Sequence, residues 1–109
     1  MVISHTDHQK LSELLQKLRQ TGNQEHVFVK VEMIFYEVLN MASSYGTDVN
    51  NNNLLLPLKQ LKQNEYQDTK GFFRKSSQRE RAIQRFIHRL KSLLTIMLKE
   101  QKLHINNNK

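Results

Sequence analysis

Basic side chains gather in one stretch of the chain, residues 70–102, which holds ten Lys or Arg and two acids, Glu80 and Glu100. The stretch carries a net charge of +8, although the whole chain carries +7. Cationic groups with so few acidic neighbours favour an anionic partner, and nucleic acid is the commonest one. We therefore predict phosphate binding here, by Lys70, Arg74, Lys75, Arg79, Arg81, Arg85, Arg89 and Lys99.

Three of these residues, Arg81, Arg85 and Arg89, are four positions apart. In a helix they follow one another at about 6 Å along the axis. Phosphates along one strand repeat at a comparable distance, and each guanidinium offers planar bidentate donors. His88, Ser92 and Lys99 fall in the same sector, whereas Arg79 points toward the opposite, apolar side. That apolar side consists of Ile83, Phe86, Leu90, Leu93, Leu94 and Met97.

A run of charges is usually a solvated helix face, on which Arg stems cover apolar surface. Such a face normally alternates acids and bases at i,i+4, where they support each other. Here the i,i+4 neighbours are mostly like charges, which is mildly destabilising unless an anion is bound. The pattern thus favours anion binding over simple solvation.

Two adjacent aromatic residues, Phe72 and Phe73, stand between Lys70 and Arg74. They could stack on bases. Adjacent Phe residues before a helix are more typical of a hydrophobic staple and core filling. We expect at least one of them in the core.

The chain has few helix breakers, with one Pro and three Gly, and its apolar residues mostly recur at helical spacing. The first helix is expected to begin after Thr6 or Asp7 and to end at Gly22. The second is expected over residues 24–43, with Gly46 closing the segment. An alternation of Val27, Val29, Val31 and Met33 would also suit a strand, but the helical period continues to Met41 and no second strand is evident.

The second half of the chain predicts two further helices. A polar loop over 44–53 leads to a short helix that begins near Pro57 and turns Leu55, Leu58 and Leu61 inward. Residues 64–71 are expected to form a linker. A long helix over 77–102 begins with a capping box of Ser77 and Glu80. The tail, 103–109, is expected to be disordered.

These elements predict one all-α domain over 1–109, a four- to five-helix bundle with a long basic C-terminal helix. Residues 1–69 form a near-neutral scaffold with a net charge of −2, and 70–102 form the basic amphipathic helix. No apolar run approaches the roughly 18 residues of a membrane span, so no membrane partner and a cytoplasmic location are expected.

Catalytic and cofactor motifs are absent from the sequence. There is no Cys. His5 and His8 could hold a metal, but a frayed polar terminus is the preferred interpretation. No glycine-rich phosphate loop, nucleophile elbow or paired acidic motif is present. We therefore expect neither an enzyme nor a cofactor.

The stretch FFRKSSQRERAIQRFIHRLKSLL, residues 72–94, resembles the C-terminal helical region of a CRISPR effector component. In size and layout the chain is similar to the small subunit of a type I Cascade complex, most of all the type I-D kind. The resemblance implies a non-catalytic helical bundle, present in several copies, that supports the guide–target hybrid and holds the displaced DNA strand. The matching positions are Arg74, Lys75, Arg79, Arg81, Arg85 and Arg89.

The sequence therefore predicts a sequence-independent nucleic-acid-binding subunit of a larger ribonucleoprotein, contacting the DNA or RNA backbone. An adaptor whose basic helix docks an acidic protein is the alternative. Attachment to an anionic membrane ranks last, because the apolar face of the basic helix is needed for the core.

Overall fold

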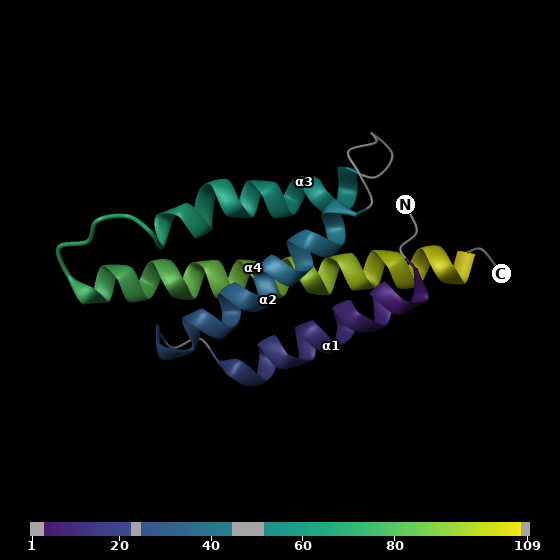
Figure 1. The fold of residues 1–109 in the computed structure, drawn as a ribbon, viewed down its shortest axis with the longest axis horizontal. Coiled ribbons are helices and arrows are strands. Elements are labelled where there is room, and N and C mark those ends of the chain that lie inside the picture. The colour runs from purple at the N-terminus through teal and green to yellow at the C-terminus, as the bar shows by residue number, and fades with distance from the viewer. Residues whose placement is uncertain (1–3, 23–24, 45–51, 108–109) are drawn as a thin grey trace.

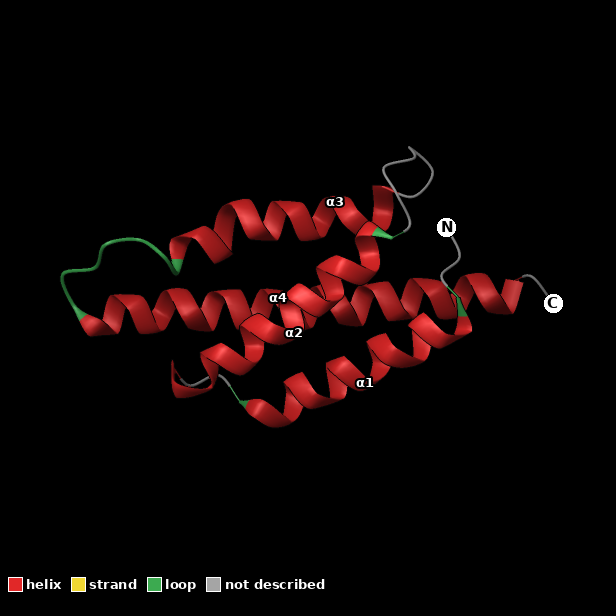
Figure 2. Cartoon of the chain, in the orientation of Figure 1, coloured by secondary structure: helices red, strands yellow, loops and turns green. Residues whose placement is uncertain are grey.

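Residues 4–22, 25–44 and 52–107 are described by the computed structural model of the chain, with side chains at all of these except 25, 52–54 and 100–107. Four α-helices form the fold: α1 (His5–Thr21), α2 (Phe28–Ser43), α3 (Asn52–Leu61) and α4 (Ser76–Asn107). A 3-10 turn, η1 (Glu25–Val27), precedes α2, and a π-helical turn, η3 (Lys62–Tyr66), extends α3. The described residues contain no strand (Figure 2), which confirms the all-α prediction.

The longest helix, α4, spans the length of the molecule, and the other helices pack along it (Figure 1). α1 and α3 flank α4 on either side and run antiparallel to it, while α2 crosses over α4 between them. One side of α4 is therefore covered by the bundle, and the other is left for solvent.

The core follows from apolar residues that repeat at three- and four-residue spacing in every helix. In α1 the four leucines that recur at helical spacing are all buried: Leu11, Leu14, Leu15 and Leu18. In α4 the buried side matches the apolar side predicted from the sequence. The residues of α4 that are buried are Ala82, Ile83, Phe86, Ile87, Leu90, Leu93, Leu94 and Met97. This burial fixes the rotation of α4 about its own axis.

The start of α1 lies earlier than predicted. Ser4, and neither Thr6 nor Asp7, is the N-cap: the Asp7 backbone N–H donates to Ser4 Oγ at 3.1 Å. Three neighbouring residues of capping type made the choice ambiguous, and the leucine spacing that begins at Leu11 does not resolve it. The predicted end at Gly22 is confirmed, and its φ of +83° is a conformation that favours glycine.

The choice of helix over strand for the second element is confirmed. A strand would place Val29, Val31 and Met33 on one face, but Val31 is fully buried while Val29 and Met33 are exposed. α2 begins at Phe28 and ends at Ser43, the predicted end. The predicted start at residue 24 and the role of Gly46 lie outside the described residues.

The predicted start of the third helix near Pro57 is wrong, whereas the inward position of its leucines is confirmed. α3 begins at Asn52, so Pro57 stands inside the helix and not in its first turn. Leu55, Leu58 and Leu61 are all buried, and this stripe extends the helix on both sides of Pro57. The burial offsets the helical hydrogen bond that proline cannot donate.

The predicted linker over 64–71 is helical through residue 68. Its polar residues are typical of turns, but Tyr66 is buried against Phe35 and Phe86, at ring-centroid distances of 5.4 and 5.2 Å. The π-helical turn η3 carries Tyr66 into that position. Aromatic burial, which local sequence does not reveal, determines the structure here.

The long basic helix is confirmed, but it begins and ends at other residues than the predicted 77 and 102. α4 begins at Ser76, so Ser77 lies inside the first turn instead of at the cap, and the Gln78 N–H donates to the Lys75 carbonyl at 3.1 Å. The helical backbone continues to Asn107, beyond the predicted end at Lys102 and into the predicted tail.

Candidate nucleic-acid interface

The three arginines at four-residue spacing, Arg81, Arg85 and Arg89, all lie exposed on the outward side of α4. We call them the arginine row. Ile83, Phe86 and Leu90, on the other side of the same turns, are fully buried. Within the described part of the chain, no carboxylate pairs with any residue of the row. The row is therefore held by a packed helix while its guanidiniums are open to an external anion.

Lys99 is exposed on the same side of α4 but stands about 15 Å beyond Arg89 along the axis. It continues the direction of the arginine row without adjoining it. Ile96 lies between them and is also exposed, as the helical projection predicts.

The loop that leads into α4 carries a second group of predicted site residues, Arg74 and Lys75, both exposed. Phe72 beside them is 95% exposed, and Phe73 is half-buried. We call Phe72, Arg74 and Lys75 the loop cluster. Neither Phe belongs to the buried core, so the expectation of a core role is wrong. In the described core, the aromatic contacts of Phe86 are made by Phe28, Phe35 and Tyr66 instead.

Lys70, another predicted site residue, is engaged inside the protein. Its Nζ donates to Glu32 Oε2 at 2.9 Å and stands over the ring of Tyr66, 5.3 Å from the centroid. The Tyr66 hydroxyl donates to the same carboxylate oxygen at 2.6 Å. Lys70 therefore ties the start of the loop to α2. No local sequence pattern indicates this contact, which joins residues 38 positions apart.

Arg79 is close enough to Glu32 for its charge to act on that carboxyl, so it lies away from the arginine row. Burial by itself raises the pKa of the Glu32 carboxyl, but hydrogen bonds from Tyr66 and Lys70 and the charges of Lys70 and Arg79 outweigh it, so the pKa falls below its ordinary value. Burial raises the pKa of Tyr66, and its hydrogen bonds with Glu32 and Tyr36 raise it further. Of the eight predicted site residues, Lys70 and Arg79 thus serve the fold as well.

Replacing Glu32 by Gln is expected to remove a pH-dependent part of the stability. Since the pKa of Glu32 is lower in the folded than in the unfolded chain, its contribution is present above the ordinary value of 4.5 and is lost as the pH falls toward the folded value. Urea unfolding from pH 7 to pH 3 should show a wild-type advantage, about 1–3 kcal/mol at pH 7, that shrinks below pH 4.5. Glu37→Gln, at an exposed carboxylate, is the control; an equal pH dependence in both variants would contradict the assignment.

Aromatic rings from α2, η3 and α4, far apart in the sequence, meet in the core. Phe35 and Phe86 stand edge to face at 5.1 Å, and Tyr36 and Tyr66 at 6.0 Å. Tyr66 is buried, whereas Tyr36 is 42% exposed. Tyr45 lies outside the described residues.

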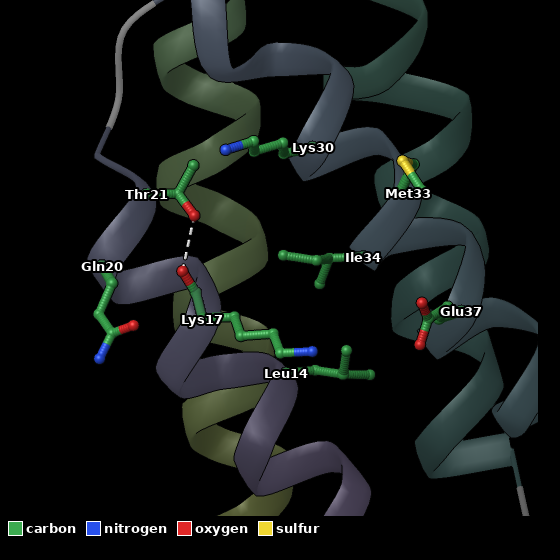
Figure 3. A pocket seen from close by; sticks show the side chains of 8 residues that line it. All are labelled: Leu14, Lys17, Gln20, Thr21, Lys30, Met33, Ile34 and Glu37. Carbon is green, nitrogen blue, oxygen red and sulfur yellow. Dashed lines mark hydrogen bonds between the residues drawn. The ribbon is translucent and has the colours of Figure 1, made fainter.

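A groove runs between α1 and α2, away from the arginine row. Leu14 and Ile34 lie at its floor, and Lys17 and Lys30 extend over it from the two helices (Figure 3). Neither lysine pairs with a carboxylate in the described part of the chain. Met33, which is exposed, and the carboxylate of Glu37 also line the groove, which thus combines apolar surface with two lysines and one acid.

Metal-binding and membrane-spanning features are not found among the described residues. His5 and His8 share the first turns of α1, but no group of three potential metal ligands forms there or elsewhere in the described chain. No described helix is long and apolar enough to cross a membrane.

Comparison with known proteins identifies no relative. No protein-family model, curated protein or solved structure matches the chain.

Proposed function

We propose that the protein is a non-catalytic, sequence-independent nucleic-acid-binding subunit that contacts the phosphate backbone. The observation that carries this proposal is the arginine row: three guanidiniums one helical turn apart, unpaired with any described carboxylate, on a helix whose other side is core. Cations on a packed helix can meet successive phosphates of one strand.

Burial of α4 supports this function through its effect on entropy. Because Ile83, Phe86 and Leu90 fix the helix, only the arginine side chains are ordered on binding. The backbone positions of the row are set in advance. Six of the predicted residues are exposed and lie outside the Glu32 contacts: Arg74, Lys75, Arg81, Arg85, Arg89 and Lys99.

Salt dependence tests the proposal. If about five phosphates are neutralised, the logarithm of the affinity should fall with the logarithm of salt concentration at a slope near −3.5 to −4.5. Oligonucleotides of different sequence should give similar affinities and slopes, because phosphates carry no sequence information. Fluorescence anisotropy between 50 and 300 mM NaCl measures both. An affinity independent of salt would exclude backbone recognition.

The setting proposed for this activity is a CRISPR-type ribonucleoprotein. It is supported by the resemblance of residues 72–94 to the small subunit of a type I Cascade complex, most of all the type I-D kind. Several copies of the chain would then lie along the guide–target hybrid or the displaced DNA strand. Arg74, Lys75 and the arginine row fall within this stretch.

A second candidate function, a helical adaptor for an acidic protein, is favoured by the groove between α1 and α2. Met33 in its lining is about two-thirds exposed, and Lys17 and Lys30 place two positive charges there against the one carboxylate of Glu37 (Figure 3). Material that co-purifies with the protein separates the two functions. Nucleic acid, seen in the absorbance ratio, supports the first, and a stoichiometric acidic protein supports the second.

A further inference from the structure

Phe72 is far more exposed than any other large apolar side chain among the described residues, at 95%. Val29 and Met33 come next at about two-thirds, and Leu56 and Ile96 are about half exposed. A phenyl ring that touches almost nothing contributes nothing to the core. It keeps its whole apolar surface in water, an arrangement favourable only if another molecule covers it.

The charges around Phe72 identify the chemistry of that molecule. Arg74 and Lys75 follow within three residues, and the arginine row begins about 8 Å along α4 from its first residue, Ser76. An aromatic ring beside cations suits a ligand that combines flat apolar faces with anions. Nucleotides have this combination, since every base has a π-face and every linkage a phosphate.

We infer that Phe72 stacks on an unpaired base, so that the loop cluster and the arginine row together take single-stranded nucleic acid in preference to duplex. This inference rests on the proposed function. Bases inside a duplex are already stacked on their neighbours and offer no free face to a side chain, whereas an open strand does.

The loop can present the ring because both of its ends are fixed. Before Phe72, the Lys70 N–H donates to the Gln67 carbonyl at 2.9 Å, the Gly71 N–H donates to the Asp68 carbonyl at 3.3 Å, and the Lys70 side chain is held by Glu32. After it, α4 begins at Ser76. The distance along the axis of α4 from Ser76 to Arg89 is about 20 Å, which is enough for three or four nucleotides of an extended strand.

A tryptophan at position 72 provides the test, because the chain contains no other Trp. In Phe72→Trp, indole emission should be quenched by a single-stranded 12-mer of thymidine and much less by a 12-base-pair duplex. Quenching by both to the same extent, or by anionic phosphatidylserine vesicles and not by the 12-mer, would overturn the inference.

Phe72→Ala is the matching affinity test. The single strand should bind roughly 10- to 100-fold more weakly, the duplex unchanged, and the salt slope unchanged, since no charge is lost. Leu56→Ala, at another exposed apolar residue, should bind like the wild type. If Phe72→Ala keeps full single-strand affinity while the arginine row remains essential, this inference fails and the proposed function stands. If the wild type binds neither probe at low salt, both fail.

Discussion

Replacing Arg81, Arg85 and Arg89 together by Ala is expected to weaken binding of a single-stranded oligonucleotide roughly 100-fold at 0.1 M salt. Each phosphate contact to a single strand contributes about 0.7 to the salt slope, which is about fivefold in affinity at that salt concentration. The slope should therefore become less steep by about 2. Because all three side chains are exposed and Ile83, Phe86 and Leu90 remain in place, the fold should be retained.

A charge-matched variant separates phosphate contacts made by the arginine row from the general effect of the protein's net charge. Lys17→Ala, Lys30→Ala and Lys59→Ala together also remove three exposed cations, but from α1, α2 and α3. This variant should keep most of the affinity and nearly the wild-type slope. Equal losses in the two triple variants would mean that the protein attracts nucleic acid only through its overall charge of +7.

Replacing Phe86 by Ala is expected to destabilise the fold by about 3–5 kcal/mol. Phe86 is fully buried and stands edge to face with Phe28 at 6.0 Å and with Phe35 at 5.1 Å, so its removal opens a cavity where α2, η3 and α4 meet. The whole stability of a domain of this size is about 5–15 kcal/mol. Urea unfolding followed by circular dichroism should show the transition displaced to much lower denaturant, or lost.

Phe72→Ala is the control for this prediction, since it makes the same chemical change at a 95% exposed position. Its free energy of unfolding should stay within about 0.5 kcal/mol of the wild type. The two phenylalanines thus have opposite expected roles, Phe86 in stability and Phe72 in binding. Similar stability losses in the two variants would contradict the burial described for both.

The features that the sequence predicts well are those that depend on spacing within one helix. Val31 is buried while Val29 and Met33 are exposed, as the helical period requires. The outward position of the arginine row follows from the same rule, because the apolar side of α4 has to face the core. Both can be placed without knowledge of the other helices.

The features that it predicts poorly depend on contacts between distant residues. Asn64, Asp68 and Gly71 indicate a turn, yet the burial of Tyr66 against Phe35 and Phe86 keeps residues 64–68 helical. The contact of Lys70 with Glu32 has no local pattern. The different environments of Phe72, almost fully exposed, and Phe73, half-buried, likewise cannot be inferred from two adjacent identical residues.

The pairing of α1 with the far half of α4 bears on how the chain folds during synthesis. Arg19 Nη2 donates to Thr95 Oγ1 at 3.3 Å, across 76 residues of sequence. At roughly 5–20 residues per second, a ribosome needs about 4–15 seconds to make that interval. Until then the leucines of α1 can be covered by α2 but not by α4, which packs on them in the complete fold. The nascent chain therefore keeps part of a leucine-rich surface exposed for several seconds, a target for chaperones before the last helix closes the bundle.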